Sequence, residues 1–246
     1  MEKNDQPWQP ATPGRLIHPN EVHIWRASLD LSKPLPENLL GTLSADELSR
    51  ASRFRFEKDQ RRFIGARGIL RQILGAYLQK PPHSLQFLYG TNGKPVLANN
   101  DTFQFNLSHS ENMVLYAITH NRNIGIDLER IREDVAIEQI SSRFFSEAEI
   151  VSMQQLTESK RNELFFQYWT RKEALIKATG VGLSVPIETF DVSGVNGSIL
   201  SPIPLPGDHG EKPQWYGQDL LPGPGYTAAI VVEGGDCGFS CWTYCA

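Results

Sequence analysis

Hydrophobic and polar residues alternate most clearly in NIGIDLER, at positions 123–130. In a β-strand, successive side chains point to opposite faces, so the large aliphatic residues share one face while Asp127 and Glu129 share the other. The β-carbons of these two acids would lie roughly 6 to 7 Å apart, at about 3.3 Å per residue, so both carboxylates could converge on one hard cation. A strand with one solvated face explains the same pattern, and the acid pair alone leaves both interpretations open.

A helical pattern follows each of two capping boxes, in which a serine and a glutamate three residues later satisfy free amides at a helix start. The first box, at residues 44–47, predicts a short helix, and apolar residues at helical spacing over 58–77 predict a longer one. The second box lies at 146–149 and precedes a predicted helix over 161–178, which Gly180 closes. The chain is therefore expected to contain two long helices.

The other apolar segments are short and are bounded by turn residues, which indicates strands. The first twenty residues are polar and contain prolines, so we expect a loose arm over residues 1–20. After this arm, the order of strand, helices and strands occurs twice, once over 21–121 and once over 122–246. The sequence therefore predicts a chain that contains both helices and strands.

The composition is that of a globular protein of 246 residues, of which 40% are hydrophobic and 10% aromatic. The formal charge of −4 argues against a surface built for nucleic acid. No apolar run reaches membrane-spanning length and no signal peptide is evident, so a cytoplasmic location is expected. Cysteines at positions 237, 241 and 245 would lie about 13 Å apart along a strand, too far for one tetrahedral metal, which favours reduced structural thiols.

Positive charge is concentrated in residues 50–71, which contain eight basic residues and two acidic ones. Such a local excess attracts anions, and it fits a phosphate-rich small ligand or an acidic protein partner. The same charge is also typical of a solvated helix face. The segment by itself therefore does not select a function.

Three further segments carry candidate chemistry. In WTRKEALIKATG, Glu173 and Lys177 are four residues apart and share a helix face, either as part of a site or as an ordinary surface ion pair. In FNLSHS, His109 lies between hydroxyl side chains at a strand end, where it could donate to an anion or be a structural histidine. Lys94, held by a following proline beside a tight turn, is a candidate phosphate contact, although turn chemistry also explains it.

In combination, FNLSHS at 105–110, GIDLER at 125–130 and WTRKEALIKATGVGL at 169–183 resemble the motifs of the Sfp (surfactin synthetase-activating) type of 4'-phosphopantetheinyl transferase. Gly-Lys-Pro at 93–95 and RFFSEAE at 143–149 also match, so the resemblance covers more than half of the chain. The resemblance implies an α+β pseudo-dimer of two similar halves, each an antiparallel sheet packed against a long helix. Because one chain then supplies both halves of the site, we expect a monomer.

The activity implied by this resemblance is the Mg²⁺-dependent transfer of 4'-phosphopantetheine from coenzyme A to a serine hydroxyl of an apo acyl or peptidyl carrier protein. Adenosine 3',5'-bisphosphate is released. Phosphoryl transfer at a pyrophosphate requires charge neutralisation and in-line positioning, which explains a site made of acidic and basic residues. An acidic, helical carrier surface would suit the basic segment whether the acceptor serves fatty-acid, polyketide or nonribosomal-peptide synthesis.

Carried over by motif, the resemblance assigns Mg²⁺ to three acids, Asp127, Glu129 and Glu173. Lys177 would face a phosphate oxygen and stabilise charge as the bridging bond breaks. Glu173 is the favoured general base for the serine proton, with Glu129 or a metal-bound water as competing assignments. The expected contacts with coenzyme A are Arg50, Lys94, Ser108, His109 and Lys177.

One segment departs from the pattern of this family. Family members offer lysines and a threonine to the 3'-phosphate of coenzyme A, whereas Glu47 and Phe63 occupy two of those places here. Arg50 aligns with the remaining basic contact. Two other functions stay open from the residues alone. One is a different Mg²⁺-dependent enzyme that cleaves a nucleotide pyrophosphate, and the other is a non-catalytic module that binds nucleic acid or an acidic protein through the basic segment.

Overall fold

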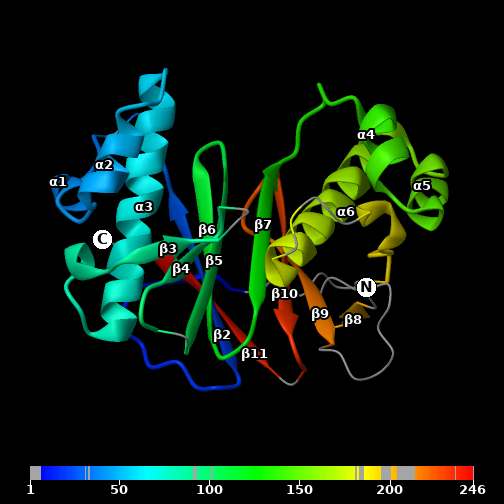
Figure 1. Cartoon of the computed structure of the whole chain (residues 1–246). Helices are drawn as coiled ribbons and strands as arrows, with labels where there is room; N and C mark the ends of the chain where they lie inside the picture. The colour runs from blue at the N-terminus through cyan, green and yellow to red at the C-terminus, as the bar shows by residue number, and fades with distance from the viewer. Residues whose placement is uncertain are drawn as a thin grey trace.

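The computed structural model of the chain describes residues 7–30, 32, 34–90, 93–100, 102–180, 182, 186–194, 201–203, 214–235 and 237–245. Two sheets lie face to face, and a long helix covers the outer face of each (Figure 1). These helices, α3 (Glu57–Leu78) and α6 (Glu158–Thr179), have 22 residues each. Within these described ranges, no helix is both long enough and apolar enough to cross a membrane.

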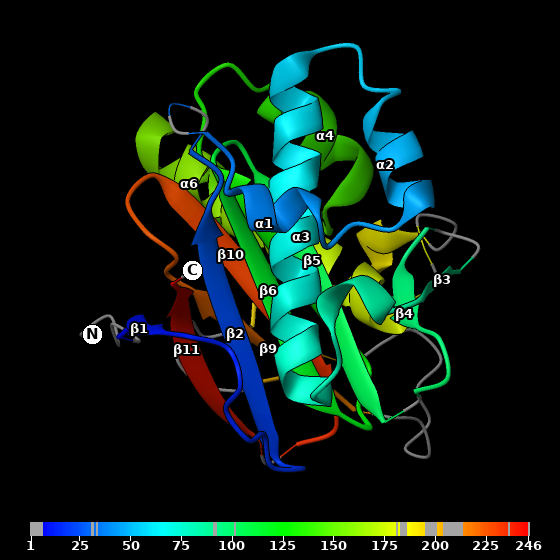
Figure 2. The same cartoon turned by 90° about the vertical axis from the view of Figure 1, so that its left-hand side faces the viewer.

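The first sheet has five strands of mixed direction, so the expectation of an antiparallel sheet in this half is wrong for the two pairings at one edge of the sheet. In spatial order they are β1 (Gln9–Ala11), β11 (Gly238–Tyr244), β2 (Glu21–Ser28), β6 (Met113–His120) and β5 (Phe103–Ser110). The strands β2, β6 and β5 are antiparallel, whereas β11 is parallel to both β1 and β2. Figure 2 shows α3 lying across this sheet.

The second sheet is antiparallel and has four strands. Their order is β7 (Ile124–Arg130), β10 (Tyr226–Glu233), β9 (Trp215–Leu220) and β8 (Ser201–Ile203). A separate two-stranded ribbon pairs β3 (Phe87–Tyr89) with β4 (Pro95–Leu97) and contributes to the first half.

Short helices precede each long helix. In the first half they are α1 (Glu37–Leu40) and α2 (Ala45–Ala51), and in the second half α4 (Ile137–Phe144) and α5 (Glu147–Gln154). A 3-10 turn follows each long helix, over Pro82–Ser84 and Ile187–Thr189 respectively. Gly180 ends α6 with a left-handed conformation, φ 72°, as the sequence predicts.

The two halves repeat the same internal contact. Both predicted capping boxes form, and in each the glutamate at the third helical position also reaches a buried base on the long helix. Glu47 lies 2.6 Å from Arg71, and Glu149 lies 3.0 Å from Lys172. Arg71 and Lys172 are each the fifteenth residue of their helices. Because the strand order β2-β6-β5 also matches β7-β10-β9, the predicted pseudo-dimer of two α+β halves is confirmed.

The strand pattern of residues 124–130 is confirmed as well. Ile124, Ile126 and Leu128 are buried in the core between the two sheets, together with aliphatic residues of β2, β6 and β10. The opposite face of β7 carries Asp127, which is only 4% exposed. The interpretation that Asp127 lies on a solvated face of the strand is therefore excluded.

Two strands differ from the expected division of the chain. β1 lies inside the arm predicted for residues 1–20, and it pairs with β11 through Gln9 and Trp242. β11 comes from the end of the chain but pairs with β2, in the sheet of the first half. An apolar segment that reads as a strand does not reveal which sheet edge it will join, because edge pairing depends on the tertiary arrangement.

Candidate active site

The two sheets meet along β5 and β7, which are side by side at the centre of Figure 1 but belong to different sheets. Hydrogen bonds from side chains of β5 join the two strands, which are not paired through backbone hydrogen bonds. The amide oxygen of Asn106 accepts a hydrogen bond from the Ile126 N–H at 2.9 Å. Ser108 Oγ donates to Asp127 Oδ1 at 2.8 Å. The FNLSHS and GIDLER motifs are therefore in direct contact, which brings the two halves together at Asp127.

Gly125 allows the third motif to reach the same place. A β-carbon on Gly125 would lie 2.0 Å from the carbonyl oxygen of Ala174 and 2.4 Å from the Ala178 nitrogen, both in the backbone of α6. Only a residue without a side chain permits this approach. The helix consequently lies directly on β7, with Glu173 and Lys177 beside the acidic face of the strand.

Lys177 and Asp127 form the central ion pair of the site. The Nζ atom lies 2.6 Å from Asp127 Oδ1 and 3.1 Å from Ser108 Oγ. The second carboxylate oxygen of Asp127, Oδ2, is buried and has no hydrogen-bond partner among the described residues. A buried carboxylate oxygen without a hydrogen-bond donor lowers the stability of the fold. This atom is therefore available to bind a cation or to accept a hydrogen bond.

Glu129 and Glu173 are half-buried, and each interacts with both members of this pair. Burial raises the pKa of both carboxyls, and the negative charge of Asp127 raises each pKa further. Lys177 opposes the shift in both, and a hydrogen bond from Ser110 Oγ at 3.0 Å opposes it in Glu129. The fold thus keeps the carboxyls of Glu129 and Glu173 close to that of Asp127, although burial disfavours the ionised form of both glutamates.

The metal assignment of these acids stays a prediction. Among the residues that the structure describes, no three His, Cys, Asp or Glu side chains are grouped closely enough to hold a metal ion. Oδ1 of Asp127 is engaged by both Lys177 and Ser108. Two features favour binding of a cation here: the repulsion between Asp127 and each glutamate, and the unpartnered Oδ2 atom of Asp127.

A cavity of about 500 Å³ opens beside Glu173 and Lys177. Its volume falls in the range of small-molecule sites. Both halves contribute to its wall, since the remaining lining residues are Gly93, Lys94, Pro95, Asn106, Leu107, Ile176, Gly180 and Gly182. The FNLSHS motif, the Gly-Lys-Pro segment and the α6 motif therefore line one cavity at the junction of the halves, and Asp127 of the GIDLER motif contacts its wall through Lys177.

Lys94 lines this cavity but bonds to the backbone of the second half. Its Nζ atom donates to the carbonyl oxygen of Ile124 at 2.9 Å and to that of Lys177 at 2.6 Å. Burial, followed by the positive charge of Lys177, lowers the pKa of Lys94 to about 8. Lys94 thus connects the β3–β4 ribbon to both β7 and α6, and its expected contact with coenzyme A stays a prediction.

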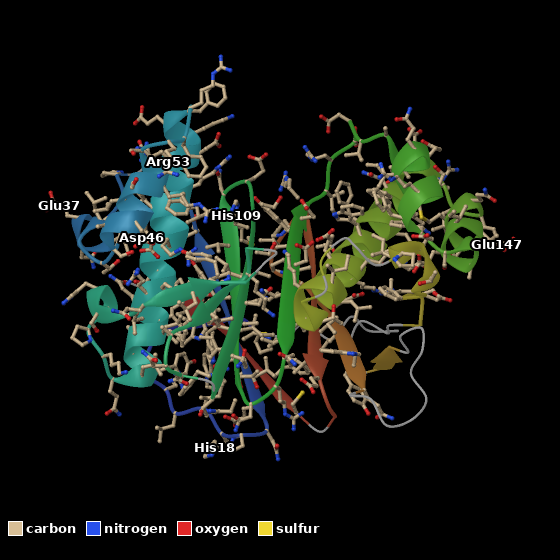
Figure 3. All side chains as sticks on the ribbon, in the orientation of Figure 1. His18, Glu37, Asp46, Arg53, His109 and Glu147 are labelled. Atoms are coloured by element: carbon tan, nitrogen blue, oxygen red, sulfur yellow. The ribbon has the colours of Figure 1, made fainter. Side chains whose placement is uncertain are left out.

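His109 follows Ser108 at the end of β5, and Figure 3 shows it between α3 and β7. Its side chain remains accessible to solvent. Partial desolvation, followed by the positive charges of Lys177 and Arg62, lowers the pKa of His109. His109 is therefore close to positive charge from α3 and from Lys177. This environment favours contact with an anion.

The basic segment divides into buried and exposed parts. Arg67 and Arg71 are buried and pair with Glu47 at 3.3 Å and 2.6 Å, so they belong to the core of the first half. Arg50 is exposed, with its guanidinium 5.5 Å from the ring centre of Phe63. Glu47, which departs from the family pattern, therefore serves to neutralise two of the eight bases.

Sequence reasoning missed the roles of Asn106 and Gly125. Asn106 is two residues before Ser108, so both side chains point to the same face of the strand. This alternation of polar residues in FNLSHS indicates a strand whose side chains bond to a neighbouring strand. Gly125 stands on the acidic face of β7, where a glycine indicates close approach of another backbone.

Comparison with known proteins agrees with this arrangement. Residues 123–231 match the 4'-phosphopantetheinyl transferase superfamily, and residues 33–121 match the family described as 4'-phosphopantetheinyl transferase, N-terminal. The 4'-phosphopantetheinyl transferase HetI of Nostoc sp. strain PCC 7120 is 39% identical over 92% of this chain and 94% of its own length. The 4'-phosphopantetheinyl transferase Sfp of Bacillus subtilis is 28% identical over 82% of this chain and 87% of its own length. The chain therefore belongs to the 4'-phosphopantetheinyl transferase superfamily and is a transferase of the Sfp type.

Proposed function

We propose that this transferase moves the 4'-phosphopantetheine group from coenzyme A to a serine hydroxyl of an apo acyl or peptidyl carrier protein, in a reaction that depends on Mg²⁺. The observation that carries the proposal is the contact of Lys177, Asp127 and Ser108 beside the cavity shared by both halves. Acidic and basic groups that converge on one cavity suit the transfer of a phosphoryl group.

Mg²⁺ would be held by Asp127, Glu129 and Glu173. The donor set fits this ion, because Mg²⁺ prefers carboxylates together with substrate phosphates. The buried, unpartnered Oδ2 of Asp127 and the raised pKa values of the two glutamates support the assignment, since a cation would relieve both costs. When bound, Mg²⁺ neutralises charge on the pyrophosphate oxygens.

Lys177 stabilises the charge that develops on phosphate oxygen during transfer. Its Nζ atom is fixed by Asp127 and Ser108, so little reorganisation is needed when substrate binds. Ser108 and His109 contact the phosphates from the first half, whereas Lys94 and Arg50 serve the adenosine 3'-phosphate end. These groups hold the pyrophosphate in line with the incoming serine.

Glu173 accepts the proton of the acceptor serine. The serine oxygen bonds to the phosphorus that carries pantetheine, the bond from this phosphorus to the bridging oxygen breaks, and adenosine 3',5'-bisphosphate leaves with that oxygen. Glu173 is proposed for this role because it lines the cavity beside Lys177, where it would lie within reach of an incoming hydroxyl.

The carrier protein would approach along the exposed bases at the α2–α3 turn. Arg50, Arg53, Arg55 and Lys58 are all exposed there, so an acidic carrier surface would be attracted toward the site. Both halves of the cavity come from one chain, and a monomer therefore suffices for this function.

The test is incubation of the protein with coenzyme A, Mg²⁺ and an apo carrier protein, followed by mass measurement of the carrier. We expect a mass gain of one phosphopantetheine at the carrier serine and release of an equal amount of adenosine 3',5'-bisphosphate. A carrier with this serine changed to alanine is the control. Cleavage of coenzyme A without any carrier mass gain, across carriers of fatty-acid, polyketide and nonribosomal-peptide type, would reject the proposal in favour of a pyrophosphate-cleaving enzyme.

A further inference from the structure

Polar side chains at every second position of β5 face β7 and connect two strands that share no backbone ladder. Asn106 accepts from the Ile126 N–H, and Ser108 donates to Asp127. Ser110, the last residue of β5, continues this series to the end of β7. The first half thereby supplies one hydrogen bond to each acid of the GIDLER strand.

Ser110 is held by two hydrogen bonds. Its hydroxyl donates to Glu129 Oε2 at 3.0 Å and accepts from the backbone N–H of Arg130 at 3.0 Å. A serine hydroxyl has one donor, so the proton of Ser110 is committed to Glu129. The bond engages one carboxylate oxygen and fixes the rotation of the glutamate side chain.

Glu129 needs such a restraint more than Asp127 does. Asp127 is 4% exposed and is held by both Lys177 and Ser108. Glu129 is half-buried, lies two residues away on the same face, and has a longer side chain that could turn toward solvent. The like charge of Asp127 favours that movement, because it repels the Glu129 carboxylate.

We propose that Ser110 is a positioning residue that holds the Glu129 carboxylate beside Asp127, ready for a divalent cation. The inference rests on the proposed function for the identity of the cation. Removal of the hydroxyl leaves Glu129 free to move away from Asp127. Cation binding must then restore the lost orientation, so affinity falls while the chemistry at saturating cation is retained.

The experiment measures binding of Mn²⁺ alone to the full chain, by electron paramagnetic resonance of the free ion, in Ser110→Ala, Ser110→Thr and the wild type. Ser142→Ala is the matched control, since Ser142 is an exposed serine whose hydroxyl donates, within the described part of the chain, only to the helical carbonyl of Gln139. We expect a three- to tenfold weaker affinity in Ser110→Ala, recovery to within twofold in Ser110→Thr, and no change in Ser142→Ala.

Activity gives a second readout. In Ser110→Ala the concentration of Mg²⁺ needed for half-maximal transfer should rise by a similar factor, whereas kcat at saturating Mg²⁺ should stay within twofold. In a Glu129→Gln background, Ser110→Ala should have no further effect on Mn²⁺ affinity, because the partner of the hydroxyl has lost its charge.

Wild-type Mn²⁺ affinity in Ser110→Ala would overturn the inference, and so would a loss of affinity that is equal with and without the Glu129 carboxylate. Failure of the proposed function is a separate result. The protein would then bind Mn²⁺ in a manner dependent on Ser110 and Glu129 but would transfer nothing to any carrier.

Discussion

Lys177 Nζ lies 2.6 Å from Oδ1 of Asp127, although the two residues are fifty positions apart and belong to α6 and β7. The side chain of Asp127 is 5% exposed and that of Lys177 29% exposed, so the pair reaches from the core to the cavity. This contact joins the second and third motifs, and Ser108 adds the first. The predictions for Lys177, Glu173 and Asp127 depend on this convergence.

Lys177→Met should lower kcat about 100- to 1,000-fold, the usual cost of removing one group that stabilises developing charge. It should also lower stability, because the buried Asp127 would lose its counter-ion. Transfer to a carrier and thermal unfolding measure the two effects. Lys160→Met, an exposed lysine of the same helix, is the control. A Lys177→Met enzyme within threefold of wild-type kcat would contradict the assigned role.

Glu173→Gln should abolish turnover and yet stabilise the metal-free protein at pH 7. The pKa of Glu173 is raised in the folded state, so the ionised form costs stability at neutral pH, and this cost disappears as the pH falls through the raised pKa. We expect the melting temperature in EDTA to rise by about 1–3 °C at pH 7, with a smaller gain near pH 5.

Glu163→Gln, at an exposed position of α6, serves as the control and should leave both the melting temperature and the turnover nearly unchanged. A Glu173→Gln protein that melts below the wild type at pH 7 would show that burial and Asp127 do not disfavour the ionised form of Glu173.

Gly125→Ala should destabilise the protein by at least about 3 kcal/mol, since its β-carbon would meet the α6 backbone at 2.0 Å and neither element can shift cheaply. Denaturant unfolding provides the measurement. Gly194→Ala is the matched control, because no atom lies within 4 Å of the β-carbon that it would add. Equal stability of the two variants would mean that α6 does not lie on β7 at this distance.

Binding of coenzyme A should weaken as the pH rises from 7 to 9. The pKa of Lys94 is lowered to about 8, so its positive charge is present below that pH and is lost above it. Calorimetric titration should give about a three- to tenfold weaker affinity at pH 9. In Lys94→Met this part of the pH dependence should be absent, and its persistence there would assign the effect to another group.

Local sequence signals predicted much of the fold. Alternation over 124–130 identified β7 and its two faces, and the capping boxes located the starts of α2 and α5. Partners distant in sequence were not predictable in the same way. The pairing of Glu47 with Arg71, 24 residues later, depends on how α2 packs on α3, and β11 joins β2 across almost the whole chain.

The sequence identified the motifs of the candidate site but not the contacts that its residues make. Spacing placed Glu173 and Lys177 on one helix face, whereas the contact of Lys177 with Asp127 was not among the expectations. A count of charge could not distinguish buried bases such as Arg67 from exposed ones such as Arg50. The backbone contacts of Lys94 carry no sequence signature, because any carbonyl can accept them.

The most direct measurement is the mass of an apo carrier protein after incubation with coenzyme A and the wild-type or Asp127→Asn protein, with Mg²⁺ or with EDTA. The account predicts one phosphopantetheine per carrier for the wild type with Mg²⁺. It predicts none in EDTA and none for Asp127→Asn, which keeps the shape of the side chain and should remain folded. Equal transfer by Asp127→Asn, or by the wild type in EDTA, would contradict the account.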